Sequence, residues 1–230
     1  ASLFSRAEEV FDEMNLRTRK VQHIVTRGGA QARAIYEFET VGVKIAEKDD
    51  LILRLSVANS FDGSIGAIFE VGFLRLVCTN GLVAPAGKGT TINKKHSISA
   101  ESSFTENKVR AAIDAFHRGA DLFRPLIQTS VDRVHGINVL GNLAQNKVVS
   151  LRTAEKIADI WNNPTYVHDH GRNLWSLYNA ATEHLTLEVA PVRYELALRS
   201  TQGIVNALHR AAVGKSPEIL DAIPSEDYRL

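Results

Sequence analysis

Apolar residues recur at every second position through much of the first half of the chain and at helical spacing in the second half. After an amphipathic helix at 4–14, the first half contains four β-favouring segments: 16–27, 33–46, 51–60 and 64–78. Gly-containing turns at 27–30 and 62–63 separate two pairs of them, and glycine tolerates the positive φ of tight hairpins. This half therefore predicts an antiparallel β-meander of about four strands.

The second half is predicted to be mostly helical. A Gly/Ser/Thr-rich stretch at 84–103 has no apolar periodicity and is expected to be a long exposed loop. Beyond it we expect helices at 105–134 (broken near Pro125), 151–163 (capped by Ser150), 172–186 and 192–213, with a polar connector at 136–149. The fold class is α+β, with helices packed on the sheet. We expect a single domain over 1–230: strand-rich 15–83, basic loop 84–103, helical 104–215 and a surface tail 216–230.

Composition narrows the class of protein. The 230 residues are 44% hydrophobic, carry a net charge of +1 and include one Cys. These values exclude a polycation and a disulfide framework, and the lone Cys excludes a Cys-based zinc site. The sequence has no long apolar run and a charged helical start, so we expect a cytoplasmic protein without a membrane segment.

The near-zero net charge hides two basic segments. Between Met14 and Tyr36 there are five basic side chains and no acidic one, and the predicted 84–103 loop is also basic. The candidate phosphate contacts are Arg17, Arg19, Lys20, Arg27, Arg33, Lys88, Lys94 and Lys95. Tyr36 or Phe61 are candidates for stacking on a base. The alternative is that the basic hairpin protects a solvated sheet edge from aggregation, with the aromatic residues in the core.

Few residues suggest catalysis. His168, Asp169 and His170 form the one ligand-like cluster, and they could equally cap a helix entry and face solvent. The sequence around Lys88 lacks the glycine spacing of a phosphate-binding loop, and no histidine lies near Cys78 in the sequence. The sequence therefore favours a protein that is not an enzyme and predicts no cofactor.

Two turn sequences carry a resemblance to a known family. The stretch 51–82 contains Asn-Ser-Phe-Asp-Gly at 59–63 and Arg-Leu-Val-Cys-Thr-Asn-Gly at 75–81, and 174–183 contains Asn-Ala-Ala-Thr. These segments resemble the family of phage- and plasmid-encoded proteins known as the domain of unknown function numbered 932. The resemblance implies a mobile-element origin and supplies no mechanism. Within it, Arg75 lies among apolar residues, so it must point outward, pair with an acid or meet a phosphate.

Three hypotheses follow. The leading one is a non-catalytic phage or mobile-element protein that binds or anneals single-stranded DNA in recombination or replication. A sheet followed by a long helix is similar, in topology alone, to the ring- or filament-forming strand-annealing proteins, which makes a homo-oligomer the expected state. The second is an accessory protein that binds a host or phage protein through Trp161, Trp175 and Tyr178. The third is a metal-dependent nuclease that uses His168, Asp169 and His170.

Overall fold

The computed structural model describes residues 2–46, 49–75, 92–94 and 104–221, and they divide into two compact units. The sheet unit comprises 1–44, 49–76 and 85–120, and the helical unit comprises 45–48, 77–84 and 121–230. We describe each unit by itself. The expectation of a single domain over 1–230 stays a prediction.

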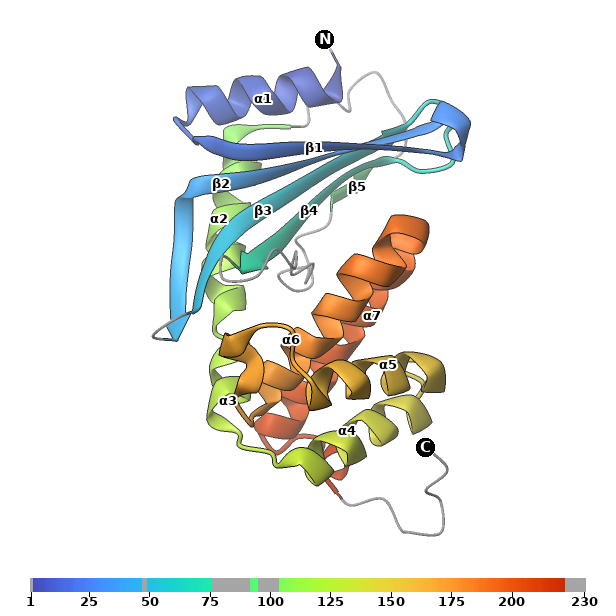
Figure 1. The fold of residues 1–230 in the computed structure, drawn as a ribbon. Coiled ribbons are helices and arrows are strands. Elements are labelled where there is room, and N and C mark those ends of the chain that lie inside the picture. The colour runs from blue at the N-terminus through green and yellow to red at the C-terminus, as the bar shows by residue number, and fades with distance from the viewer. Residues whose placement is uncertain (1, 47–48, 76–91, 95–103, 222–230) are drawn as a thin grey trace. The chain divides into compact units, whose positions relative to one another are not determined.

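The sheet unit contains an antiparallel sheet in the order β1-β2-β3-β4-β5 (Figure 1). Its elements are α1 (Leu3–Glu13), β1 (Thr18–Thr26), the 3-10 turn η1 (Arg27–Gly29), β2 (Gln31–Ala46), β3 (Asp49–Ser60), β4 (Ala67–Arg75), β5 (Ile92–Lys94) and α2 (Glu106–Ala120). Gly28 and Gly29 adopt φ of 62° and 98° in the β1–β2 turn, as their sequence predicted. The predicted α+β class and the four-stranded meander are confirmed.

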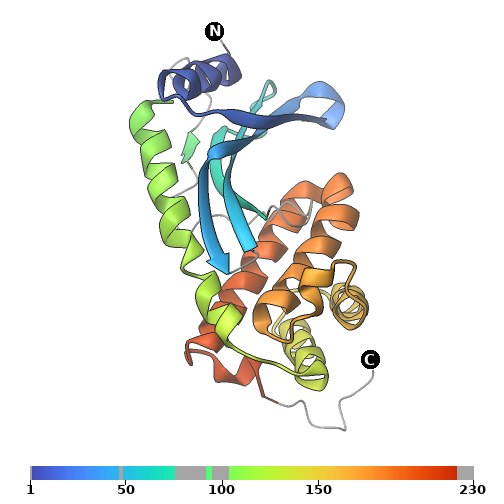
Figure 2. The same ribbon diagram turned by 60° about the vertical axis from the view of Figure 1, so that its left-hand side comes forward.

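Aromatic side chains join the two helices of this unit to the sheet. Phe11 of α1 packs edge-on against Tyr36 and Phe38 of β2 at ring distances of 5.0 and 4.9 Å. Farther along, Phe73 of β4 lies 5.0 Å from Phe116 of α2. Figure 2 shows α2 (green) running beside the strands. The apolar face of the meander is thus buried by the helices on either side of it in the sequence.

The helical unit consists of helices packed around a second aromatic cluster. Its elements are α3 (Phe123–Gln128), α4 (Arg133–Gln145), α5 (Leu151–Asn162), the 3-10 turn η2 (Val167–His170), α6 (Leu174–His184), a π-helical segment η3 (Leu185–Val189), α7 (Ala190–Ala212) and the 3-10 turn η4 (Pro217–Ile219). Phe123, Trp175 and Tyr178 are in ring contact at 5.0 to 5.9 Å. Together with Trp161 they are buried, so the aromatic residues of the protein-binding hypothesis belong to the core.

The structure corrects three predictions of local structure. The prediction of a polar connector at 136–149 is wrong, because α4 occupies most of this range. Asp132 caps this helix by accepting from the His135 amide at 2.8 Å, a start signal that the polar composition obscured. Asn142 is buried and donates to the carbonyl oxygens of Glu218, Ile219 and Asp221. This polar side chain therefore stabilises the interior and does not mark an exposed connector.

The other two corrections concern the loop expected at 84–103 and the helix expected at 105–134. Residues 92–94 of the expected 84–103 loop form β5, which pairs with β4, whereas 84–91 and 95–103 lie outside the described residues. The helix expected at 105–134 is broken as predicted, but the break lies at 121–122, Pro125 is inside α3, and the chain leaves helical structure after Gln128. No helix of the described residues combines the length and apolarity needed to span a membrane.

Candidate nucleic-acid interface

The edge strand β1 presents its basic residues to solvent. Its five consecutive residues from Arg19 to His23 are all exposed, so side chains on both faces of the strand are accessible. Arg17 precedes the strand and Arg27 follows it, and both are exposed. Within the described residues, none of Arg17, Arg19, Lys20 and Arg27 lies in an ion pair. These four side chains, which we call the β1 cations, are available to an anionic partner.

The tip of the β1–β2 hairpin adjoins the loop that leads to β4. The amide of Phe61 donates to the carbonyl oxygen of Ala30 at 2.8 Å, and the Gln31 side chain donates to Ser64 Oγ at 2.8 Å. Figure 1 shows both turns at the same end of the sheet. Phe61 is 84% exposed, an unusual position for a large apolar residue. An exposed aromatic ring therefore lies beside the turn that contains Arg27.

Arg33 does not belong to this exposed surface. It is buried on the second strand, donates to Ser56 Oγ at 2.6 Å and forms an ion pair with Glu70 of β4. A buried arginine that left its acid partner to contact a ligand would leave a buried carboxylate without a compensating charge, which is costly. Arg33 is therefore placed as a cross-strand structural residue.

Arg75 pairs with an acid, one of the three roles that its apolar sequence context allowed. Its side chain is 0% exposed and forms an ion pair with Asp49 at the start of β3, two residues before Leu51, which lies opposite Arg75 in the sheet. Asp49 is 12% exposed at its side chain. The arginine of the family-like sequence at 75–81 thus stabilises the β3–β4 pair, and 76–81 lies outside the described residues.

Tyr36 is likewise buried, beneath α1. Its hydroxyl donates to Glu8 Oε1 at 3.2 Å, and burial together with the nearby carboxylate raises the pKa of the Tyr36 hydroxyl. This ring serves the core, which leaves Phe61 as the accessible aromatic candidate. Lys88 and Lys95 lie outside the described residues, and Lys94 is described only as a backbone position of β5 opposite Ala67.

Two of the three residues of the candidate metal site have described side chains, Asp169 and His170. They lie on η2, where Asp169 is buried and accepts from Asn179 Nδ2 at 3.2 Å, while His170 is exposed. The side chain of His168 is not among those described. Across the described part of the chain, no three His, Cys, Asp or Glu side chains gather closely enough to hold a metal ion.

Comparisons with known proteins point to one family. No curated protein and no solved structure matches the chain. The model of one family, described as a domain of unknown function (DUF932), matches residues 7–211, which include both the sheet and the helices described above. The chain therefore belongs to the DUF932 family.

Proposed function

We propose that this protein is a non-catalytic nucleic-acid-binding protein that holds a single strand along the β1 edge of its sheet. The observation that carries the proposal is the row of β1 cations, exposed and without an ion-pair partner among the described residues. From Arg19 to Thr26 the strand advances about 23 Å, at roughly 3.3 Å per residue, and Arg27 follows it directly. Cations spread over that length suit a run of phosphates better than a single anion.

The accessible aromatic ring adds a second element of single-strand recognition. Unstacked bases pack on exposed aromatic rings, whereas a paired duplex keeps its bases stacked inside. Phe61 offers such a ring beside the turn that contains Arg27. This arrangement favours a single strand and little preference for sequence, because phosphate contact and stacking are both tolerant of base identity.

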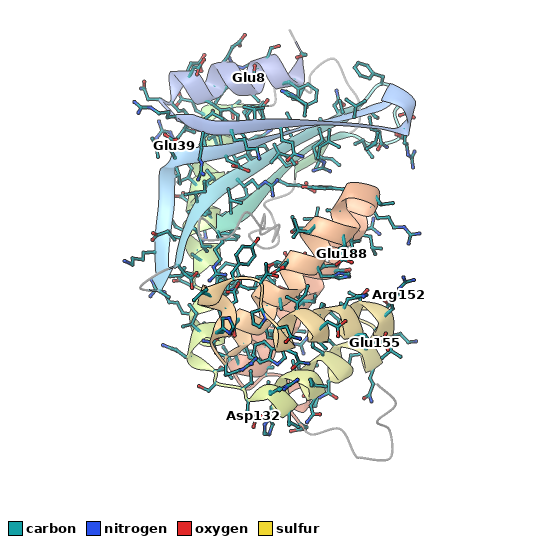
Figure 3. The ribbon with its side chains drawn as sticks, viewed as in Figure 1. Glu8, Glu39, Asp132, Arg152, Glu155 and Glu188 are labelled. Atoms are coloured by element: carbon teal, nitrogen blue, oxygen red, sulfur yellow. The ribbon has the colours of Figure 1, made fainter. Side chains whose placement is uncertain are left out.

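An acidic neighbour gives the proposal an internal check. The amide of Glu39 donates to the carbonyl oxygen of Arg17 at 3.1 Å, and the Glu39 side chain is exposed (labelled in Figure 3). A carboxylate there repels a phosphate held by Arg17. Glu39→Gln is therefore expected to tighten binding modestly, whereas the same change at Glu155, an exposed residue of α5, leaves binding unchanged.

The wider setting is part of the same proposal. We infer that the protein acts in the cytoplasm as a homo-oligomer, annealing or protecting single strands during recombination or replication of a phage or other mobile element. Repetition of a short basic edge around an oligomer would multiply a modest affinity by raising the effective concentration of binding sites.

Fluorescence anisotropy with labelled single-stranded DNA, duplex DNA and RNA tests the proposal. Titrations at about 50 and 200 mM salt are compared, because the affinity from phosphate contacts falls steeply with salt concentration. The expected result is salt-sensitive binding that is tightest for single strands. Absence of binding at the lower salt would refute it and leave the basic hairpin as a protected sheet edge.

A further inference from the structure

A pocket of about 510 Å³ opens within the helical unit, between the start of α5, the π-helical segment η3 and the first turns of α7. It is large enough for a small organic ligand, since such sites span roughly 300 to 1,000 Å³. The side chains that give it chemical character are Arg152, Lys156, His184, Glu188, Arg193 and Leu196. None of them belongs to the β1 edge, so the pocket is a separate feature of the molecule.

Positive charge gathers at one side of this pocket. Arg152 and Lys156 come from successive turns of α5 and Arg193 comes from α7, and none of the three has an ion-pair partner in the described part of the chain. The first turn of α5 also lines the pocket, through Ser150 and Thr153. Ser150 Oγ accepts the Thr153 amide at 3.1 Å, which leaves the earlier amides of this helix end facing outward without helical partners.

The opposite side is built by an interruption of the helix. Between α6 and α7 the chain forms five residues of π-helix, Leu185–Val189, and Arg193 then departs from helical geometry with φ −140° and ψ 65°. π-helical turns of this kind are rare and occur frequently at functional sites. Here the interruption brings Glu188 and Arg193 to the same pocket as α5, and Figure 3 shows Arg152 and Glu188 on one side of the helical unit.

A buried imidazole lies in the wall. The side chain of His184 is 7% exposed, and its Nδ1 makes no hydrogen bond within the described residues, although Glu188 Oε2 lies 3.3 Å away. This nitrogen has almost no accessible surface, so the imidazole shapes the wall of the pocket and is not among the groups that a ligand would contact.

We propose that the pocket binds a nucleoside phosphate. The phosphate lies at the start of α5 between Arg152 and Lys156, where side-chain charge and helix-end amides act together. The Glu188 carboxylate accepts hydrogen bonds from sugar hydroxyls, because an acid among three cations suits a ligand that carries donors as well as negative charge. Leu185, Val189 and Leu196 provide the apolar surface for the base.

Isothermal titration calorimetry of the full chain with ATP, adenosine and inorganic phosphate tests this site. ATP is expected to bind with a Kd tighter than about 1 mM, and adenosine and phosphate each more weakly, since each supplies part of the contacts. The double variant Arg152→Ala/Lys156→Ala is expected to raise the Kd for ATP at least about tenfold. Arg199→Ala, an exposed arginine of α7 outside the pocket, serves as the matched control and is expected to change nothing.

The outcomes separate a small ligand from a nucleic-acid backbone. Unchanged ATP binding in the double variant, or no ATP binding by the wild type at millimolar concentration, would overturn the proposal. A double variant that weakens oligonucleotide binding as much as ATP binding would also overturn it, because the cations would then serve the strand. Retention of ATP binding when the β1 cations are neutralised would support a separate site, whatever the outcome at the hairpin.

Discussion

Neutralising three of the β1 cations is the sharpest perturbation of the proposed interface. The variant Arg17→Gln/Arg19→Gln/Lys20→Gln removes three exposed charges that make no ion pair among the described residues, so the fold should persist. Each phosphate contact to a single strand contributes about −0.7 to the slope of log K against log salt. Four contacts therefore give a slope of about −2.8, and the variant retains about −0.7.

These slopes translate into different losses of affinity on adding salt. Between about 50 and 200 mM salt, the wild type is expected to lose about 50-fold in affinity and the variant only about threefold. Anisotropy titrations with a labelled single strand at several salt concentrations measure both slopes. The matched control Arg118→Gln/Arg199→Gln/Arg210→Gln removes the same net charge from exposed helical positions and should keep the wild-type slope. Equal slopes in the triple variant and the wild type would refute the assignment of the β1 edge.

Three further predictions concern stability. Arg75→Ala leaves the Asp49 carboxylate without its buried partner and should lower the free energy of unfolding in urea by about 3–5 kcal/mol; a loss under 1 kcal/mol would contradict the role of the pair. Gly136→Ala would place a Cβ 2.5 Å from Trp161 Nε1 and should lower the free energy of unfolding by about 1–3 kcal/mol, measured by urea unfolding followed by Trp fluorescence. An unchanged midpoint would show that the two helices can move apart at no cost. Burial raises the pKa of the Tyr178 hydroxyl, so the unfolded chain loses this proton at lower pH than the folded chain does. Stability is therefore kept below about pH 10 and falls as the pH rises above that value. Tyr178→Phe should therefore flatten the alkaline decline in thermal midpoint, and an identical decline would exclude this residue as a cause.

The sequence predicted the sheet well because its signals are local. Alternating apolar residues and glycine turns determine strand and hairpin positions within a few residues, and Gly28 and Gly29 adopt the expected positive φ. Helix α4 was missed because its buried asparagines have the composition of a connector. The hydrogen-bond partners of Asn142 lie 76 to 79 residues farther along the chain, where no local pattern can reveal them.

The candidate interface was predictable only in part, for a related reason. A run of basic residues marks the edge strand, but Arg33 and Arg75 carry the same charge and are taken up by Glu70 and Asp49 from other strands. Only the pairing of strands distinguishes an exposed arginine from a buried one. The pocket at α5 had no sequence signal, since Arg152 and Lys156 at i and i+4 are ordinary on a solvated helix.

Photocrosslinking tests the location of the nucleic-acid site most directly. A single-stranded oligonucleotide that contains a photoreactive thymidine analogue would be crosslinked to the wild-type protein, and the modified peptides identified by mass spectrometry. We predict adducts on peptides that contain residues 17–31 and on Phe61. Adducts confined to the helices of residues 121–221, or equal labelling in the presence and absence of excess unlabelled strand, would contradict binding at the β1 edge.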